Sequence, residues 1–215
     1  MRVNSAKSEV SITVVRRLPK YYQYLKDLEM REVEKISSKQ LADLMGLTAS
    51  QIRQDLNFFG AYGQQGYGYR VTELKDAIRN ILGLSRKYKS VVVGAGNLGR
   101  AISNYERFGH ENIEIVAMFD QDPNKIGKEV GSIPIKDIAE FNDFVEKEGI
   151  SIAILSVPRE VGQKLTDTIV ASGIKGILNL VPLDLNVPDD VKVENVNITD
   201  SILTVTYYLD DMSEK

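Results

Sequence analysis

Three observations on the sequence predict an α/β fold with two domains and a C-terminal helix. Charge changes sign along the chain: residues 1–90 carry 16 Lys and Arg against 9 Asp and Glu, whereas residues 91–215 carry 11 against 21. Two short helical patterns joined by a glycine turn lie in the basic part, and strand and helix patterns alternate after a glycine-rich turn in the acidic part. We predict a winged helix-turn-helix domain over 1–86, a Rossmann doubly wound parallel sheet over 87–198 and a terminal helix over 199–215.

Composition disfavours several classes of protein. Of the 215 residues, 43% are hydrophobic and 27% are charged, as in ordinary globular proteins. The sequence has no run of 18 apolar residues and no pattern of a secretory leader, so we expect a cytoplasmic protein without a membrane partner. It contains no cysteine and one histidine, His110, which argues against a metal site and against catalysis by either residue type.

The basic part opens with one helix, in which apolar residues recur every three to four positions. The apolar face after Pro19 consists of Tyr21 or Tyr22, Leu25 and Leu28. This spacing predicts an amphipathic helix with proline in its first turn. The sequence leaves open whether residues 12–18 form a separate short helix.

A helix-turn-helix pattern follows. Ser37 and Gln40 form a capping-box pattern, and Gly46 ends the helix that they open. Thr48 and Gln51 repeat the pattern for a second helix. The residues expected to face inward are Leu41, Leu44 and Met45 from the first helix and Ile52, Leu56 and Phe59 from the second. Two short helices joined by a glycine-containing turn are typical of a DNA-binding motif.

The outward side of the second helix predicts a surface that reads double-stranded DNA. Such a helix enters the major groove, where each base pair presents its own pattern of donors and acceptors. Arg53 suits guanine, Gln51 or Gln54 suits adenine, and Lys39 suits phosphate. The DNA-binding residues predicted in the two helices are Lys39, Ser50, Gln51, Arg53, Gln54 and Asn57. The alternative is that these residues form only the solvated face of a helix bundle.

A wing is predicted after the second helix. Residues 60–71 alternate aromatic residues with glycines, a pattern that suits a two-stranded ribbon. Gln65 and Tyr67 in this ribbon join the DNA-binding candidates. The wing and the basic charge together favour DNA binding over the bundle alternative. Thr72 is expected to cap a further helix, whose buried stripe consists of Leu74, Ile78 and Leu82.

The acidic part begins with a nucleotide-binding motif. A buried strand over 90–93 runs into a GxGxxG turn made of Gly94, Ala95, Gly96, Asn97, Leu98 and Gly99. The first glycine permits the tight turn, the second lets a pyrophosphate approach the backbone, and the third lets the following helix pack on the strand. The amides at the start of that helix suit phosphate groups.

An acidic residue completes the motif. A second strand over 113–119 ends at Asp120, which lies 21 residues after Gly99. A carboxylate at this place accepts a hydrogen bond from the ribose 2′-hydroxyl and repels a 2′-phosphate. The predicted cofactors are therefore NADH and NAD+ rather than the NADP forms.

Strands and helices continue to alternate to the end of the chain. We expect helices near 138–147 and through 165–170, and strands over 150–157, 176–180 and 192–198, which together form a parallel sheet. Ligands of such sheets lie beyond the carboxyl ends of the strands. Two Val-Pro pairs lie at these ends, and they either contact the ligand or simply form turns; they are Val157-Pro158 and Val181-Pro182.

The tail is predicted to form an amphipathic helix. Thr199 or Asp200 can cap it. Its apolar residues are Ile202, Leu203, Val205, Tyr208 and Leu209. The helix either closes its own domain or docks on a partner subunit, and the sequence does not choose between these.

Taken together, these motifs resemble the Rex family of redox-sensing transcriptional repressors over nearly the whole chain. The segments that carry the resemblance are Arg17-Leu18-Pro19, Tyr21-Tyr22, RQDLNFFGAYGQQGYGY at 53–69, GAGNLG at 94–99, FDQDP at 119–123, SVPRE at 156–160 and GIKGILN at 173–179. The resemblance implies a homodimer, not an enzyme, that binds a palindromic operator when NADH is low and releases it when NADH binds.

The resemblance also implies roles for residues outside the motifs. The C-terminal helix of the family is exchanged between subunits, which would bring Asp200 near the partner's nicotinamide. Tyr105 is assigned to the polar network beside the nicotinamide. Val157 and Pro158 are also counted among the cofactor-binding residues, because they lie at the carboxyl end of a predicted strand.

Two positions depart from the family pattern. Gln23 stands where many relatives carry arginine, which puts in doubt an Arg-Asp contact between the two domains. Gln64 and Gln65 stand where relatives often carry Lys or Arg, which predicts a smaller salt dependence of DNA binding.

Two other functions compete with this interpretation. One is an NAD-dependent dehydrogenase with an accessory domain, but a dehydrogenase needs a positioned acid or base, and His110 is expected in a surface loop. The other is a module that binds CoA or another adenine nucleotide.

Overall fold

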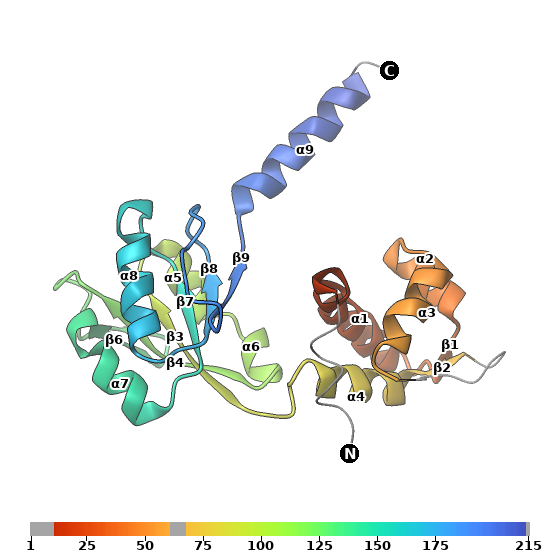
Figure 1. Cartoon of the computed structure of the whole chain (residues 1–215), viewed down its shortest axis with the longest axis horizontal. Helices are drawn as coiled ribbons and strands as arrows, with labels where there is room; N and C mark the ends of the chain where they lie inside the picture. Colours follow the sequence, from red (N-terminus) through yellow and green to blue (C-terminus); the bar gives the residue numbers. More distant parts are fainter. Residues whose placement is uncertain (1–10, 61–67, 214–215) are drawn as a thin grey trace. The chain divides into compact units, whose positions relative to one another are not determined.

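A computed structural model describes residues 11–60 and 68–213 of the chain. The chain divides into two units, of which the first ends at Arg86 and the second begins at Lys87. The elements of the first unit are α1 (Ile12–Met30), β1 (Lys35–Ile36), α2 (Ser38–Met45), α3 (Ala49–Asn57), β2 (Tyr69–Arg70) and α4 (Val71–Ile81). Figure 1 shows them with their labels.

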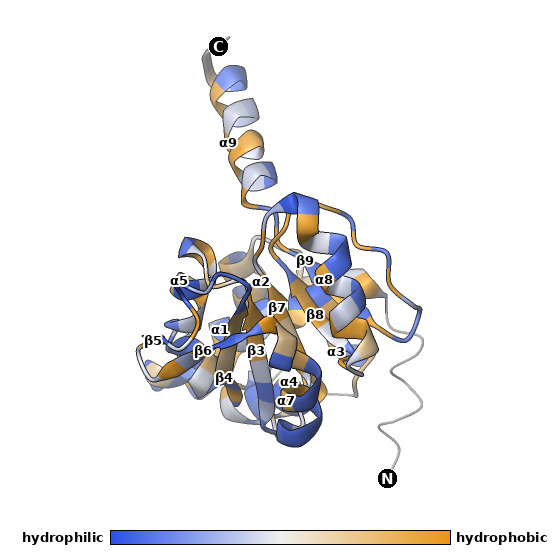
Figure 2. Ribbon diagram, turned by 90° about the vertical axis from the view of Figure 1, so that its left-hand side faces the viewer, coloured by the Kyte–Doolittle hydropathy of each residue, from blue (hydrophilic) through white to orange (hydrophobic). Residues whose placement is uncertain are grey.

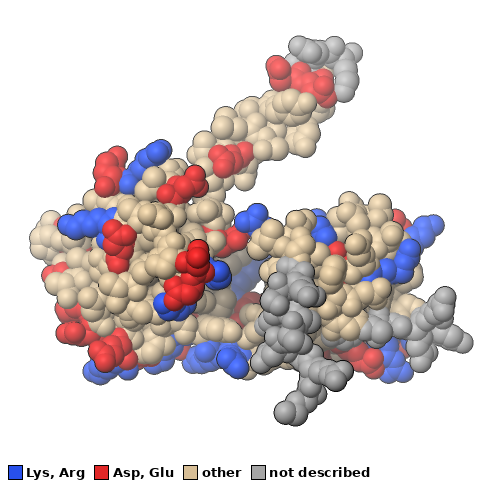
Figure 3. Space-filling model, in the orientation of Figure 1, with Lys and Arg blue, Asp and Glu red and all other residues tan. Residues whose placement is uncertain are grey.

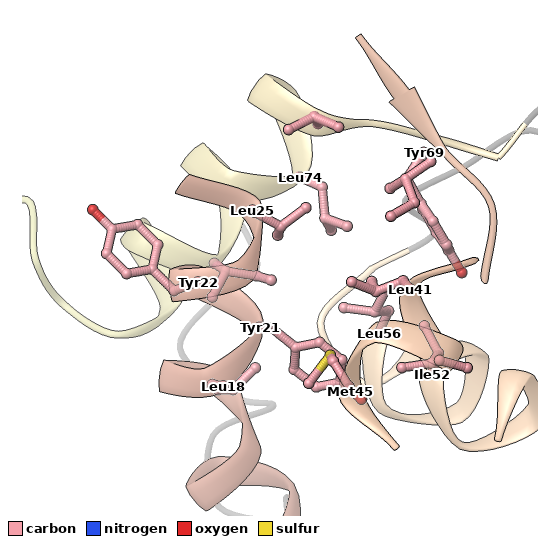
Figure 4. Packing of buried hydrophobic residues seen from close by; sticks show 14 residues of the cluster. Leu18, Tyr21, Tyr22, Leu25, Leu41, Met45, Ile52, Leu56, Tyr69 and Leu74 are labelled. Carbon is pink, nitrogen blue, oxygen red and sulfur yellow. The ribbon is translucent and has the colours of Figure 1, made fainter. Parts of the chain in front are cut away.

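The helices of the first unit surround one apolar core. Figure 4 shows side chains from α1, α2, α3 and α4 converging together with Tyr69 of β2. The buried members include Leu18, Tyr21, Leu25, Leu41, Met45, Ile52, Leu56, Leu74 and Ile78. Leu44, expected to face inward, is 46% exposed instead, because the other side of α2 meets the core.

The first helix is longer than predicted. It begins at Ile12, so residues 12–18 are part of α1 and Pro19 lies inside the helix rather than in its first turn. Pro19 has no N–H to donate within the helix. The helix continues nevertheless, since its buried face runs on both sides of Pro19, from Val14 to Leu25.

The two capping boxes of the helix-turn-helix are present as predicted. The Ser37 hydroxyl accepts from the Gln40 amide at 3.1 Å, and the Gln40 side chain accepts from the Ser37 amide at 2.9 Å. Thr48 and Gln51 repeat this exchange at the start of α3, at 3.2 Å in each direction. Gly46 ends α2 in the left-handed conformation, with a φ of 66°.

The predicted wing is only partly described. β2 pairs antiparallel with β1, which precedes the helix-turn-helix, and Lys35 lies opposite Arg70. Residues 61–67, which include Gln65 and Tyr67, lie outside the described residues. α4 begins at Val71, so Thr72 is in its first turn and is not the cap, and Leu82 is only partly buried.

The second unit is built on a seven-stranded sheet. Its strands are β3 (Tyr88–Val93), β4 (Ile113–Asp120), β5 (Glu129–Val130), β6 (Ile133–Asp137), β7 (Ile152–Leu155), β8 (Gly176–Asn179) and β9 (Lys192–Asn195). The order is β5-β6-β4-β3-β7-β8-β9, and each neighbouring pair is parallel except β5 with β6. The helices are α5 (Asn97–Ser103), α6 (Arg107–His110), the 3-10 turn η2 (Ile138–Glu140), α7 (Phe141–Glu148), α8 (Arg159–Ala171) and α9 (Ile198–Ser213).

Both faces of the sheet are covered, as the doubly wound prediction requires. Val91 and Val93 of β3 pack in a cluster with Phe141 of α7 and Ile169 of α8. Val92, which points to the opposite face, packs in a second cluster that includes side chains of α5 and α6. Figure 2 shows the apolar strands at the centre of this unit.

Several elements of the second unit differ from the sequence predictions. The β5–β6 hairpin, which turns at Gly131 with a φ of 63°, was not predicted. His110 is the last residue of α6 and not a loop residue, although it is exposed. The predicted helix over 138–147 begins as the 3-10 turn η2, and the strands end earlier than expected at Leu155, Asn179 and Asn195.

The C-terminal helix is not covered by the unit to which it belongs. α9 begins at Ile198, and the Asn197 side chain accepts from the Thr199 amide at 3.0 Å, so neither Thr199 nor Asp200 is the cap. Its large apolar side chains are exposed by about half or more; they are Ile198, Ile202, Leu203, Val205, Tyr207, Tyr208, Leu209 and Met212. Figure 3 shows that the middle of α9 carries no charge, whereas acidic side chains gather at its end.

Candidate functional site

The turn between β3 and α5, residues 94–99, which we call the cradle, holds three glycines in different surroundings. Gly94 has a φ of 103°, and a Cβ added there would lie 2.0 Å from the Ser156 carbonyl oxygen. A Cβ on Gly99 would lie 2.0 Å from the Gly94 carbonyl oxygen. At Gly96, by contrast, an added Cβ would meet no atom within 4 Å. Packing therefore requires the outer two glycines, while the middle glycine leaves open space where a pyrophosphate can approach the backbone.

Asp120, at the end of β4, is bonded to this cradle. Its Oδ2 accepts from the Ala95 amide at 2.8 Å and from Lys125 Nζ at 3.0 Å, and its Oδ1 accepts from the Asp122 amide at 2.9 Å. Burial of the carboxyl raises its pKa, but the hydrogen bonds from Asp122, Lys125 and Ala95 outweigh this and hold the pKa of Asp120 below its usual value. Asp120 is therefore a carboxylate at neutral pH.

A cavity of about 300 Å³ lies beside the cradle, at the carboxyl ends of β3, β4 and β7. Its lining residues include Gly94, Gly96, Asp120, Gln121, Asp122, Lys125, Ile138, Val157, Pro158 and Leu165. The carboxylate suits a ribose diol, the open glycine suits a pyrophosphate and the apolar side chains suit a planar ring. These residues fit one end of a dinucleotide.

The structure gathers some of the predicted cofactor residues and not others. Gly94, Gly96, Asp120, Val157 and Pro158 meet at the cavity. Ala95 and Gly99 support the turn from within, being buried, whereas Asn97 and Leu98 lie exposed in the first turn of α5.

Tyr105 and Asp200 lie outside this cavity. Tyr105 stacks edge-to-face on Phe108 at 5.2 Å and lines a separate hollow of about 690 Å³. Asp200 lines a third hollow, of about 280 Å³, together with Arg159, Val181 and Pro182. The second Val-Pro pair is therefore not at the cradle.

Lys125 was missed by the sequence analysis. It follows Asp120 by five residues, and the backbone turn between them returns its amine to the carboxylate. The only signal in the sequence is the short polar segment that follows β4. Its sequence does not show that the chain turns back and brings Lys125 to Asp120, because this depends on the hydrogen bonds of the turn.

The predicted DNA-reading residues lie on the exposed side of α2 and α3. Lys39, Ser50, Gln51, Arg53, Gln54 and Asn57 are all exposed. Arg53 Nη1 donates to the Ser38 hydroxyl at 3.1 Å, which ties the reading helix to the start of α2. The Gln51 side-chain oxygen is used in the capping box of its own helix.

A buried acidic residue of α3 was not assigned a role from the sequence. Arg17 of α1 donates to both oxygens of Asp55 at 2.7 Å, and the Tyr21 hydroxyl donates to Asp55 Oδ2 at 2.7 Å. Burial, reinforced by the hydrogen bond to Asp55, raises the pKa of Tyr21. We name these three residues the α1–α3 clamp, because they fix the reading helix to α1.

Two other kinds of site are missing from the described part of the chain. Within residues 11–60 and 68–213, no helix has the length and apolar character to cross a membrane. The same residues contain no group of three or more His, Asp or Glu that could hold a metal ion.

Known proteins resemble both units and the whole chain. A family model described as a CoA binding domain matches residues 85–183, and one described as a putative DNA-binding protein N-terminus matches residues 9–57. The redox-sensing transcriptional repressor Rex of Clostridium kluyveri is 50% identical over 206 residues, which cover 96% of this chain and 98% of that protein. The Rex protein of Clostridium botulinum strain Alaska E43 is 50% identical over 200 residues, with coverage of 93% and 95%.

The chain belongs to the Rex family of redox-sensing transcriptional repressors. Solved structures agree with this membership. The crystal structure of RSP in complex with NAD+ and operator DNA matches with a TM-score of 0.91 and 46% identity, over 95% of this chain and 94% of that chain. RSP in complex with NADH matches with a TM-score of 0.89 and 43% identity, over 95% and 96%. The predicted Rex resemblance and the predicted fold class are confirmed.

Proposed function

We propose that this chain is a transcriptional repressor that binds operator DNA when NADH is low and releases it when NADH binds. The observation that carries the proposal is the Asp120 carboxylate, hydrogen-bonded to the Ala95 amide at the side of the cradle that Gly96 leaves open. This carboxylate suits a ribose diol and opposes a phosphate on it. It therefore favours NADH and NAD+ over CoA, whose ribose carries a phosphate.

The ligands of the solved relative support the same assignment. RSP has been crystallised with NADH, and with NAD+ together with operator DNA. A ligand can shift the equilibrium between bound and released conformations only if it prefers one of them. We propose that NADH prefers the released conformation of this chain, and that the positive ring of NAD+ is less favoured in an apolar nicotinamide pocket.

The DNA side of the proposal rests on the exposed residues of α3. Arg53 is the candidate for guanine, and Gln54 is the better candidate for adenine because Gln51 already caps its own helix. Ser50 and Asn57 share the exposed side of α3, and Lys39 on α2 is positioned for phosphate. Gln65 and Tyr67 of the wing stay predictions.

We propose that the functional form is a homodimer whose subunits exchange α9. The exposed apolar side chains of α9 support this, since a uniformly exposed apolar surface favours association. Exchange would carry Asp200 to the nicotinamide side of the partner's site, where Tyr105 is also expected. Two reading helices about 34–36 Å apart, or a multiple of this, would then match a palindromic operator.

We propose a regulator rather than a dehydrogenase. His110, exposed on α6, does not line the cavity beside the cradle. Because the partner is chromosomal DNA, we place the action of the chain in the cytoplasm. The domain boundaries that we propose are 1–86 for DNA binding, 87–198 for the dinucleotide and 199–215 for the exchanged helix.

Substitution of Arg53 tests the proposal. The operator is first selected from random duplexes with the purified full-length chain, in the absence and presence of NADH. Arg53→Ala should then weaken binding to the selected duplex about 10- to 100-fold, because a bidentate contact to guanine is lost. NADH affinity, followed by the fluorescence of the cofactor, should not change.

Arg31→Ala is the matched control, because Arg31 is an exposed arginine of the same unit at the end of α1. It should bind the duplex within about twofold of wild type. Equal duplex affinity of the Arg53→Ala variant and wild type would contradict the assignment of α3. Absence of NADH binding by the wild-type chain would contradict the proposed function as a whole.

A further inference from the structure

Lys125 lies at the edge of the cavity where Asp120 would bind a ribose, and its positive charge is paired with the Asp120 carboxylate. We call this part of the cavity the ribose edge. Lys125 Nζ lies 3.0 Å from Asp120 Oδ2 and 3.9 Å from Asp122 Oδ2. All three side chains line the same cavity as Gly94 and Gly96. Asp120 is nearly buried, with 10% of its side chain exposed, whereas 36% of the Lys125 side chain is exposed. A charged amine therefore stands at the cavity, neutralised by a carboxylate.

The position of Lys125 does not depend on that carboxylate alone. The Lys125 and Ile126 amides both donate to the Asp122 carbonyl oxygen, at 2.9 and 3.2 Å. The Asp122 side chain in turn accepts from the Asn124 amide at 2.9 Å. The Lys128 amide donates to the Lys125 carbonyl oxygen at 3.1 Å. These bonds within the turn hold Lys125 together with the bond from the Asp122 amide to Asp120 Oδ1, at 2.9 Å; of these, only the last involves the side chain of residue 120.

We propose that Lys125 forms a latent site for a 2′-phosphate, and that the Asp120 carboxylate, which pairs with Lys125, keeps this chain from responding to NADPH. The inference rests on the proposed dinucleotide function of the cavity. With Asp120 present, the amine is paired and the carboxylate repels a 2′-phosphate. With a small neutral residue in its place, the amine keeps only the more distant Asp122 carboxylate, 3.9 Å away, and can bind a phosphate group by a charge-assisted hydrogen bond.

The charges at this edge predict graded effects. Asp120, Asp122 and Lys125 sum to one negative charge in the wild-type chain. Asp120→Ser brings the sum to zero, and a further Asp122→Asn change brings it to one positive charge. Adding Lys125→Met to Asp120→Ser restores one negative charge without restoring the carboxylate that binds the diol. NADPH affinity should increase as the summed charge of these three positions becomes more positive.

The experiment measures NADH and NADPH dissociation constants by cofactor fluorescence, using the full-length chain. The wild-type chain should prefer NADH. Asp120→Ser should weaken NADH about tenfold and strengthen NADPH about tenfold, because one hydrogen-bond acceptor is lost and one amine is released. Asp120→Ser with Lys125→Met should lose the gain in NADPH affinity, and Asp120→Ser with Asp122→Asn should increase it.

Lys128→Met in the Asp120→Ser background is the matched control, since Lys128 is an exposed lysine that does not line the cavity. It should leave the NADPH affinity of Asp120→Ser unchanged. Circular dichroism checks that each variant is folded; if Asp120→Ser is not, Asp120→Asn replaces it, because its side-chain oxygen can still accept from the Ala95 amide.

An NADPH gain that survives Lys125→Met would overturn the proposal, as would a folded, NADH-binding Asp120→Ser chain without any gain. Failure of the wild-type chain to bind NADH is a different result, because it would contradict the dinucleotide function itself.

Discussion

At the scale of single residues, Asp55 links the reading helix to the rest of its unit. A buried carboxylate needs partners for both oxygens, and Arg17 supplies a two-pronged donor while Tyr21 adds a third hydrogen bond. The outward neighbours of Asp55 on α3 are the DNA-reading candidates. The α1–α3 clamp therefore fixes the orientation in which those side chains are presented.

Asp55→Ala should lower both stability and DNA affinity. The change leaves the Arg17 guanidinium and the Tyr21 hydroxyl without their acceptor, and should lower the free energy of unfolding of the first unit by about 2–4 kcal/mol. Thermal unfolding followed by circular dichroism and duplex binding both measure this effect. NADH binding should be little affected.

Asp43→Ala is the matched control, because Asp43 is an exposed carboxylate on α2. It should shift stability by no more than about 0.5 kcal/mol. If Asp55→Ala and Asp43→Ala had the same stability and the same DNA affinity, the clamp would have no role in holding α3.

The position of Asp120 could be predicted from the sequence, whereas the contacts of Asp55 could not. Asp120 could be predicted to lie at the cradle because a parallel βαβ unit always brings the ends of its two strands together. Asp55 and Arg17 lie 38 positions apart on two helices, and no periodic pattern reveals which buried polar groups meet across a helix interface. Gln51 fitted both the capping-box pattern and the set of DNA-reading candidates. Only its hydrogen bond from the Thr48 amide shows that the cap uses its side-chain oxygen.

At the scale of elements, the glycines of the cradle have separable roles. Gly99→Ala forces a Cβ to 2.0 Å from the Gly94 carbonyl oxygen, so α5 must shift away from β3. We expect a loss of about 1–3 kcal/mol or more in the free energy of unfolding of the second unit. Gly96→Ala meets no atom within 4 Å and has an ordinary φ of −78°, so this variant should fold like wild type.

Gly96→Ala should nevertheless bind NADH more weakly, because its methyl group fills the space that the pyrophosphate needs. Thermal shift assays compare the stability of the two variants, and cofactor fluorescence compares their affinity. A Gly96→Ala chain with wild-type NADH affinity would show that the phosphates bind elsewhere.

Elements with a strong local signal were predictable, and those that depend on distant contacts were not. The caps of α2 and α3 were placed to the residue, since a capping box needs only side chains three positions apart. The two-residue strand β5 is too short for a periodic pattern, and it exists by pairing with β6. α1 extends past Pro19 because burial on both sides of it outweighs the missing hydrogen bond.

At the scale of the whole molecule, α9 is the element that its own unit leaves uncovered, and we proposed above that a partner subunit covers it. Its apolar residues are exposed in the unit that carries it, as Figure 2 shows by the hydrophobic bands along the helix. A chain that ends at Asn197 should therefore be a monomer, whereas the full-length chain should be a dimer by sedimentation velocity. The shortened chain should also bind the operator more weakly, because the two reading helices are no longer coupled. A dimer of the shortened chain would contradict the role of α9.

In the proposed function, one chain couples a basic DNA-binding unit to a site for NADH. The most direct test is the fluorescence anisotropy of a labelled duplex, selected as the operator, with the full-length chain bound to it. Addition of NADH should lower the anisotropy to that of free duplex, while NAD+ at the same concentration should leave the complex intact. Equal anisotropy at every ratio of NADH to NAD+ would contradict the coupling between the two sites.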